Sequence, residues 1–229
     1  MDLIIKPTEK CNFACTFCSS TNLVTEKSTQ LDLDLIKRFL KRFPNTRTII
    51  VNGGDPLMVH PSYYWELIEH LNANSLGARL SFTTNLWAFY KDPSKWLELF
   101  QNDRVGVNTS FNFGETRRIS KSRNFDVDTF WQVSNLFFDK VGYRPDFISI
   151  INSDNVSTAI DNVRLAKKMN VICKLNYAMM SGNETKPFLR SSLYGIYLNI
   201  IELNLHPWEY NSTELLRKSN LLSTTCPLN

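Results

Sequence analysis

The sequence contains no uninterrupted apolar run near the roughly 18 residues that a helix needs to cross a membrane. Its first residues, MDLIIKPTEK, lack the apolar core and the small-residue cleavage site of a signal peptide. These two absences argue against a membrane protein and against export. We therefore expect a soluble, cytoplasmic protein whose thiols stay reduced.

Strong charge and low-complexity segments are also missing. The formal net charge is +4, well short of the dense basic stripe that would by itself indicate a nucleic-acid-binding protein. No linker rich in glycine, proline and serine divides the chain, and no internal repeat is visible beyond an alternation of strand and helix patterns. With 229 residues, 43% of them hydrophobic, the chain can bury one sizeable core, so we expect one main domain.

Short β-branched runs alternate with amphipathic stretches along most of the chain. The runs predict strands at residues 3–6, 48–52, 80–84, 105–111, 147–152 and 172–177. The stretches between and after them predict helices at residues 31–43, 62–74, 93–102, 126–141, 156–169 and 190–205, with a further short helix at 212–219.

Strict alternation of strands and helices predicts an α/β fold with a parallel sheet, right-handed crossovers and helices on the outside. Six such units are two short of a closed eightfold barrel, so we expect a partial (β/α)6 TIM-type barrel that is open on one side. This barrel should span residues 1–205, with residues 206–229 as a C-terminal tail that packs on or extends it. In such sheets the chemistry lies at the C-terminal ends of the strands.

What the chain does have is three cysteines close together. Cys11, Cys15 and Cys18, three of the five cysteines in the chain, lie in the loop after the first predicted strand. Three thiolates in one loop can bind three corners of a 4Fe-4S cube and leave the fourth iron without a protein ligand, whereas closed clusters and structural zinc sites use four ligands. The alternatives are thiols that merely pack, or a zinc ion completed by a distant ligand: His60, His206 or Cys226.

The spacing CxxxCxxC after a first strand, with the aromatic Phe17 directly before the third cysteine, resembles the signature of radical S-adenosylmethionine (SAM) enzymes. In that family the open iron is chelated by the amino and carboxylate groups of SAM. An electron from the reduced cluster splits SAM into methionine and a 5'-deoxyadenosyl radical. The resemblance covers roughly residues 3 to 180 and implies that Cys11, Cys15 and Cys18 are the metal-binding and catalytic residues of an oxygen-sensitive iron-sulfur enzyme.

Two further loops resemble elements of the same family. GGDP, at residues 53–56, stands where the family carries GGEP, whose backbone binds the SAM amino group, with Asp55 in place of the glutamate. TTNL, at residues 83–86, resembles the family's TNG element near the methionine end of SAM, with Leu86 in place of glycine. Polar residues at the ends of the fourth and fifth strands would hold the SAM carboxylate and ribose, or else simply cap the strands. The resemblance thus implies this set of cofactor-binding residues: Phe17, Gly53, Gly54, Asp55, Pro56, Thr84, Asn85, Ser110 and Asn152.

The loop after the fourth predicted strand, NFGETRRISKSRNF, carries basic residues on the catalytic face. Because arginine makes bidentate contacts with carboxylates and phosphates, they are candidates for a substrate clamp; the alternative is a solvated charged loop. The candidates are Arg117, Arg118 and Arg123. The segment also loosely resembles radical SAM peptide maturases, which add further cysteine-ligated clusters. Here only Cys173 and Cys226 remain, too few for a second four-cysteine cluster.

These observations favour a radical SAM enzyme that acts on a C–H bond of a peptide or amino-acid-like substrate. One alternative is modification of a nucleotide or nucleobase in RNA or DNA, with aromatic residues stacking a base: Trp87, Phe89, Tyr90, Trp208 and Tyr210. Another is a non-enzymatic iron-sulfur or metal-binding protein. The radical hypothesis also implies an external low-potential electron donor of the flavodoxin or ferredoxin type.

Overall fold

The computed structural model of the chain describes residues 1–18, 30–178, 184 and 190–225. Its strands are β1 (Asp2–Ile5), β2 (Thr48–Val51), β3 (Arg79–Thr83), β4 (Val105–Ser110), β5 (Arg118–Ser120), β6 (Arg123–Asn124), β7 (Phe147–Ile151) and β8 (Cys173–Tyr177). Its α-helices are α1 (Leu33–Arg42), α2 (Pro61–Ala73), α3 (Trp87–Lys91), α4 (Ser94–Phe100), α5 (Val127–Val141), α6 (Ala159–Met169), α7 (Arg190–Glu202) and α8 (Tyr210–Thr225). Short 3-10 turns are η2 (Pro56–Met58), η3 (Val156–Thr158) and η4 (His206–Trp208).

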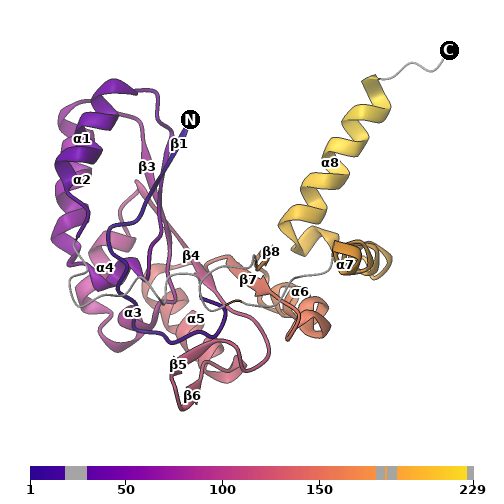
Figure 1. Ribbon diagram of the computed structural model, residues 1–229. Coiled ribbons are helices and arrows are strands. Elements are labelled where there is room, and N and C mark those ends of the chain that lie inside the picture. Colours follow the sequence, from indigo (N-terminus) through magenta and orange to yellow (C-terminus); the bar gives the residue numbers. More distant parts are fainter. Residues whose placement is uncertain (19–29, 179–183, 185–189, 226–229) are drawn as a thin grey trace.

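Six strands form one parallel sheet in the order β1-β2-β3-β4-β7-β8. The helices that connect them lie on one side of this curved sheet, with α1 and α2 side by side beyond β1 and β3 (Figure 1). The predicted partial barrel is therefore confirmed. Because all six strands run in the same direction, the loops that follow them meet along one rim of the sheet.

The two faces of the sheet differ in burial. The helix-facing side is a closed aromatic core, in which the Phe82 ring lies 4.7 Å from Tyr64 of α2 and 5.7 Å from Phe100 of α4. Since side chains alternate along a strand, the residues between these point to the other face, which we call the inner face. Its residues are exposed or half-buried: Asp2, Ile4, Thr48, Ile50, Arg79, Ser81, Thr83, Gly106, Asn108, Ser110, Ile148, Ile150, Lys174 and Asn176.

Two short elements lie where the sequence predicts only loop. The first is α3, which starts after Leu86, a residue in the left-handed region at φ 60°, and is capped by the Asn85 side chain, which accepts from the Trp87 N–H. The second is the antiparallel hairpin of β5 and β6. In addition, the helix predicted from residue 156 begins as the turn η3, and α8 is longer at both ends than the predicted 212–219.

At its C-terminal end the described chain leaves the body as α8 (Figure 1). No helix in the described ranges has both the length and the apolar composition needed to cross a bilayer.

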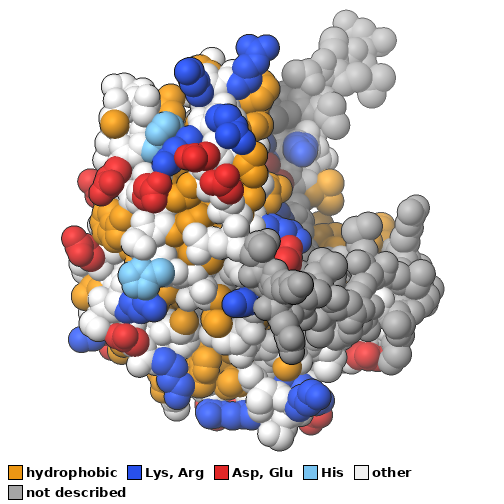
Figure 2. All heavy atoms as spheres, turned by 60° about the vertical axis from the view of Figure 1, so that its left-hand side comes forward, with side chains coloured by type: hydrophobic (Ala, Val, Ile, Leu, Met, Phe, Trp, Pro, Cys, Tyr) orange, Lys and Arg blue, Asp and Glu red, His pale blue; other side chains and the backbone are white. Residues whose placement is uncertain are grey.

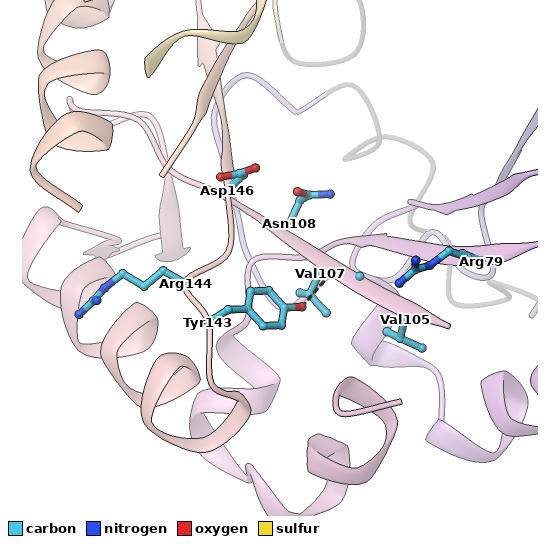
Figure 3. Close-up of a pocket in the computed structure, with 8 residues that line it drawn as sticks. Arg79, Val105, Val107, Asn108, Tyr143, Arg144 and Asp146 are labelled. Carbon is cyan, nitrogen blue, oxygen red and sulfur yellow. Dashed lines mark hydrogen bonds between the residues drawn. The ribbon is translucent and has the colours of Figure 1, made fainter. Parts of the chain in front are cut away.

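The sheet opens between β4 and β7 at the N-terminal ends of these strands. Only Thr109 and Ser110 of β4 pair with β7, and the earlier Val107 N–H donates instead to the Tyr143 hydroxyl at 3.1 Å. This separation leaves a hollow of about 370 Å³, lined by Arg79, Asn108, Tyr143, Arg144 and Asp146 among others (Figure 3). The hollow lies at the end of the sheet opposite the rim where the loop chemistry is expected.

The free edge of β8 is covered by the segment that leads into α8. Glu209 bridges to Cys173 and is fully buried, and its carboxylate accepts from the Leu175 N–H at 3.1 Å and from the Ser212 N–H and hydroxyl at 2.6 Å. Asn211 donates to the Leu175 carbonyl at 2.8 Å. The backbone of β8 thus finds partners on the side where no further strand of the sheet continues.

The Glu209→Ala substitution should destabilise the fold. It removes one buried acceptor that serves three donors, and each orphaned buried donor costs about 1–3 kcal/mol. We expect the free energy of unfolding, measured in urea, to fall by about 3 kcal/mol or more. The matched control is Glu214→Ala on α8, whose half-buried carboxylate pairs among the described residues with Arg217 and which should leave the midpoint nearly unchanged. Equal midpoints for the two variants would contradict this role of Glu209.

Candidate functional site

Cys11, Cys15 and Cys18 lie in the loop after β1, with Cys15 buried and the other two half-buried. Burial, with smaller contributions from Asp55, Cys15 and Cys18, raises the pKa of the Cys11 thiol to about 12. The three sulfurs are therefore close enough to influence one another's charge. A metal that binds here must displace protons, as is usual for cysteine ligands.

A cluster and a single metal ion would use the cysteines differently. The cysteines of a 4Fe-4S cube bind separate iron corners, whereas the ligands of a single ion converge on one point. In the described part of the chain, no three His, Cys, Asp or Glu side chains converge in that way. Of the residues considered for completing a zinc site, His60 caps α2 through Ser62, and Cys226 lies outside the described residues.

The cysteine loop is held from one side by the β5–β6 hairpin. The Ala14 N–H donates to the Arg118 carbonyl at 2.8 Å, and the Thr16 N–H donates to the Thr116 carbonyl at 2.9 Å. On the same loop the Phe13 ring packs against Phe125, with ring centroids 5.1 Å apart. The loop after β4 is thus a structural partner of the cysteines as well as a charged segment.

The two glycines of the GGDP loop allow it to lie directly on the segment before Cys11. The Gly54 N–H donates to the Thr8 carbonyl at 2.9 Å, and the Asp55 N–H donates to the Lys10 carbonyl at 2.8 Å. Gly53 has φ 137°, which side chains rarely adopt, and a Cβ on Gly54 would overlap the carbonyl oxygens of Glu9 and Lys10. The glycines are therefore needed for close packing within the chain itself.

The Asp55 carboxylate joins the GGDP loop to the TTNL loop. It is 1% exposed and accepts from the Leu57 N–H at 2.9 Å, the Asn85 N–H at 2.8 Å and the Thr84 hydroxyl at 3.0 Å. Burial raises its pKa to about 6, while these hydrogen bonds act in the opposite direction. In the same loop Pro56 is buried, and its carbonyl accepts from the Tyr64 hydroxyl at 2.6 Å. Asp55 and Thr84, both predicted to bind the cofactor, are therefore hydrogen-bonded to each other.

Asn85 reaches from the TTNL loop to the cysteine loop. Its side-chain N–H groups donate to Asn12 Oδ1 at 2.7 Å and, in a longer contact of 3.9 Å, to Cys11 Sγ. Cys11 Sγ also accepts from the Phe13 N–H at 3.3 Å. Hydrogen bonds of this kind to a cysteine sulfur orient a metal ligand and adjust the potential of a bound cluster.

Arg117 is the charged side chain that the structure brings to the cysteines. It is 6% exposed, donates to Ser110 Oγ at 2.9 Å and to Asn112 Oδ1 at 3.2 Å, and lies 5.3 Å over the Phe17 ring. Burial lowers its pKa, and the three cysteines, Cys15 foremost, act in the opposite direction. Within the described residues no carboxylate pairs with this guanidinium. A buried positive charge is thereby left facing the cysteine loop.

The remaining predicted site residues are placed apart from this group. Arg118 and Arg123 lie on the hairpin, where the Arg118 guanidinium bonds to the carbonyls of Glu115 and Lys121. Asn152, at the end of β7, accepts from two backbone N–H groups of the following turn and donates to Glu184 Oε2 at 2.7 Å. Their predicted roles in binding substrate and SAM stay predictions.

Two residues of the site are missing from the sequence-based set. Asn112 follows Ser110 by two positions, so the alternation of side chains along β4 could have indicated it. Asn12 is recognisable only from its contact with Asn85, which joins residues 73 positions apart. Cys173 is buried as the first residue of β8, away from the cysteine loop.

The sequence profile of the Radical SAM superfamily matches residues 5–190 of this chain. Among curated proteins, the GTP 3',8-cyclase of Yersinia pestis is 25% identical over 167 residues, which cover 69% of this chain and 49% of that protein. The GTP 3',8-cyclase of Mannheimia succiniciproducens is 29% identical over 98 residues, which cover 41% of this chain and 28% of that protein. The chain thus spans half or less of the length of these relatives.

Solved structures show the same architecture. The structure of anSMEcpe with bound AdoMet, another abbreviation of SAM, superposes with a TM-score of 0.67 at 16% identity and covers 89% of this chain and 59% of that chain. SuiB of Streptococcus suis bound to the precursor peptide SuiA gives a TM-score of 0.62 at 14% identity and covers 89% of this chain and 46% of that chain. At these identities the likeness shows the fold.

The Gly54→Ala substitution should disturb the cysteine loop. Its methyl group would overlap two carbonyl oxygens of the segment before Cys11, and such overpacking costs about 1–3 kcal/mol. We expect a lower free energy of unfolding and less iron bound per chain after anaerobic reconstitution. Gly77→Ala is the control, because a Cβ at Gly77 meets nothing within 4 Å. Wild-type stability and iron content in Gly54→Ala would show that the close approach is dispensable.

The buried Asp55 carboxyl should make stability depend on pH. Its folded-state pKa of about 6 lies above the ~3.9 of an unfolded aspartate, so the folded chain binds this proton more tightly. Relative to Asp55→Asn, the wild type should be most stable below about pH 4 and lose up to ~3 kcal/mol between about pH 4 and pH 6, with no further change above. Urea midpoints of both proteins from pH 4 to pH 8 measure this. A difference between the two midpoints that does not change with pH would show that the pKa of Asp55 is not raised in the folded chain.

Proposed function

The chain belongs to the radical SAM superfamily, and we propose that it is an enzyme that uses a 4Fe-4S cluster and SAM to abstract hydrogen from a substrate C–H bond. The observation that carries this proposal is the buried Arg117 guanidinium beside three cysteines of one loop, without a carboxylate partner among the described residues. Because the chain spans only part of the length of its relatives, the complete activity and the substrate belong to the proposal.

Cys11, Cys15 and Cys18 fit three corners of such a cluster. They lie in one loop, and Cys11 Sγ already accepts N–H groups from Phe13 and Asn85, which would stabilise a thiolate bound to iron. When bound, the cluster and SAM together supply the one-electron cleavage of SAM that yields methionine and a 5'-deoxyadenosyl radical.

Arg117 fits the carboxylate group of SAM. A buried guanidinium without a counter-ion is costly, and a carboxylate ligand would offset this cost through charge-assisted hydrogen bonds. Ser110 and Asn112 hold its orientation from one side, and the Phe17 ring covers its face. The predicted roles of Ser110 and Phe17 in the cofactor site are then indirect, because both act through Arg117.

Asp55 and Thr84 act as positioning residues in this proposal. They bond to each other and hold the TTNL loop against the GGDP loop, which leaves the backbone of Gly53 and Gly54 at the rim beside the cysteines. Aromatic rings behind the cysteine loop exclude water from it: Phe13, Trp87 and Phe125 lie with centroids 5.1 to 6.4 Å apart. Orientation and water exclusion are what a protein contributes to a reaction whose bond-breaking is supplied by cofactors.

The inner face of the sheet favours a peptide or amino-acid-like substrate. Its exposed and half-buried residues are mostly apolar or neutral, such as Ile150, Asn108 and Asn176. Its charged residues are Asp2 and Arg79, at the N-terminal ends of β1 and β3 away from the rim, and Lys174. The Lys174 ammonium lies 5.0 Å over the Tyr210 ring. A surface of this composition suits neutral side chains and amide groups better than the several negative charges of a triphosphate.

A nucleotide substrate is the second candidate, favoured by the similarity to two GTP 3',8-cyclases. Of the aromatic residues considered for base stacking, Trp87 and Phe89 are buried in the core and are not available to a base, whereas Tyr210 is exposed. If this candidate holds, adding GTP to the assay described next should raise 5'-deoxyadenosine formation, and a peptide mixture should not.

The proposed function predicts reductive SAM cleavage that depends on Arg117. The chain is reconstituted anaerobically with iron and sulfide, reduced with dithionite and mixed with SAM, and 5'-deoxyadenosine is quantified by mass spectrometry. We expect product from the wild type and none from Cys15→Ala. Arg117→Gln should keep its cluster, as seen in its absorbance, but bind SAM ~10- to 100-fold more weakly, the loss expected for one or two charge-assisted hydrogen bonds.

Arg164→Gln is the matched control for Arg117→Gln, because Arg164 is exposed and its one ion pair within the described ranges is with Asp161. It should bind SAM like the wild type. Unchanged SAM affinity in Arg117→Gln would remove Arg117 from the site. No 5'-deoxyadenosine from a wild-type chain that carries a full cluster and binds SAM would refute the proposed reaction.

A further inference from the structure

The hollow between β4 and β7 is separate from the cysteine loop. It lies at the N-terminal ends of these strands, whereas the cysteine, GGDP and TTNL loops follow the C-terminal ends of β1, β2 and β3. Its volume is about 370 Å³, and none of the described residues that line it belongs to the predicted cofactor or substrate set. The proposed function therefore leaves this hollow without a role.

One wall of the hollow is β4 itself, at Gly106. The neighbouring Val105 and Val107 are buried toward the helices, so position 106 faces the inner side of the sheet. A Cβ on Gly106 would meet nothing within 4 Å, and its φ lies outside the left-handed region. The backbone thus does not require glycine here, and open space lies directly over the strand.

Two acceptor groups meet on the β7 side of the hollow. Thr109 pairs with Phe147 across the two strands. The residues before them, Asn108 and Asp146, therefore lie opposite each other and point to the inner face. Figure 3 shows the amide oxygen of Asn108 turned toward Asp146, while the amide nitrogen donates to Ser81 Oγ at 3.3 Å. An ammonium group between Asp146 and Asn108 would have an acceptor on either side.

Donor groups stand apart from these acceptors. The Arg79 guanidinium, from the first residue of β3, is directed toward β4 (Figure 3) and donates to the Asp103 carbonyl at 2.7 Å. The Tyr143 hydroxyl accepts from the Val107 N–H at 3.1 Å, so its own proton can be donated to a further acceptor. The hollow therefore offers a cation at one end and a carboxylate at the other.

Opposite charges on the outer, helical face are arranged differently. Figure 2, in which α1 and α2 come forward, shows Lys and Arg side chains interspersed with Asp and Glu. There they pair directly, as Lys37 does with Glu66 at 2.6 Å. Among the described residues, neither Arg79 nor Asp146 has an opposite charge within ion-pair distance. Because β4 lies between them, the backbones of β3 and β7 are about 10 Å apart or more.

The other charged residues near the hollow add no excess of one sign. Arg144 also lines it, but its guanidinium points away, donates to Asn135 at 2.6 Å and lies 4.6 Å over the Phe138 ring. Asp103 lines an adjoining hollow of about 530 Å³. A polyanion such as a nucleotide would need an excess of cations, and a metal ion would need more than one carboxylate. A ligand with one charge of each sign fits better.

We propose that this hollow binds a short zwitterionic peptide of about two or three residues, with its ammonium between Asp146 and Asn108 and its carboxylate at Arg79. An extended residue spans about 3.3–3.6 Å, so this length covers the ~10 Å between the outer two strands. A free α-amino acid carries both charges on one carbon and would reach only one end. Gly106 leaves room for the peptide to cross β4, and Tyr143 can donate to its carbonyl oxygen. No chemical step is proposed here.

The test is isothermal titration calorimetry of the full chain with triglycine. We expect saturable binding with a Kd of about 1 mM or less. N-acetyl-triglycine and triglycine amide each lack one terminal charge and should bind at least ~10-fold more weakly, the loss expected for one charge-assisted hydrogen bond. Free glycine should also bind more weakly, because it cannot span the hollow. Equal affinity for triglycine and its capped forms, or for triglycine and glycine, would overturn the proposal.

Two variants locate the binding in the hollow. Gly106→Val fills the space over β4, and Asp146→Asn removes the charge but keeps an acceptor for the Ile172 N–H, which Asp146 binds at 2.7 Å. Both should weaken triglycine binding at least ~10-fold. The matched controls are Gly77→Val, where a Cβ also meets nothing within 4 Å, and Asp139→Asn at an exposed position of α5. Both controls should bind triglycine like the wild type.

The outcome is independent of the proposed function. Triglycine affinity should be the same before and after anaerobic reconstitution with iron and sulfide, because the hollow lies at the opposite end of the sheet from the cysteines. A chain that binds triglycine but cleaves no SAM would keep this site and lose the proposed reaction. A chain that cleaves SAM but shows no saturable triglycine binding, or binds it equally in Gly106→Val, would lose this site and keep the reaction.

Discussion

The arrangement of the site depends on one buried carboxylate. Asp55 accepts hydrogen bonds from both the η2 turn and the TTNL loop, while its own N–H donates to the carbonyl that precedes Cys11. Three loops that follow three adjacent strands are thereby joined at one point. A neutral apolar side chain could not satisfy these donors. Because they are buried, a donor that loses the carboxylate cannot bond to water instead, so these hydrogen bonds are costly to break.

The second constraint is the buried Arg117. Arg117 directly precedes β5 and Arg118 is its first residue. The Arg117 side chain bonds to Ser110 of the sheet, whereas the Arg118 side chain bonds to carbonyls of the hairpin segment itself, so the two point in different directions. The inward guanidinium loses its hydration, and neutral partners such as Ser110 and Asn112 compensate its hydrogen bonds but not its charge. The hairpin that carries Arg117 also holds the cysteine loop through backbone hydrogen bonds. The hairpin segment therefore sets both the position of the Arg117 guanidinium and the position of the cysteine loop.

The main strands and the loops of the site could be predicted from the sequence, whereas the hairpin and the contacts between distant loops could not. The six main strands are β-branched runs bounded by polar turns, and the cysteines and glycines have diagnostic spacings, so fold and loop locations follow from local patterns. The β5–β6 hairpin has no such pattern, since its sequence RISKSRN shows little alternation of apolar and polar residues. Its position is set by backbone hydrogen bonds to the cysteine loop. The inward orientation of Arg117, the partners of Asp55 and the contact between Asn85 and Asn12 depend on how distant loops approach one another.

The two buried charges have opposite consequences for a cluster. Asp55 is one of the groups that raise the pKa of Cys11, so it opposes formation of the thiolate that a metal needs. Arg117 interacts favourably with the charged form of all three cysteines, Cys15 foremost. In the proposed function, three thiolates on a cluster would add negative charge next to a guanidinium that has no carboxylate partner among the described residues, so binding of the cluster would offset part of the cost of burying Arg117. Cluster binding and the stability of this half of the sheet should therefore be thermodynamically linked, because the ligand interacts with a charge arrangement that exists only in the folded chain.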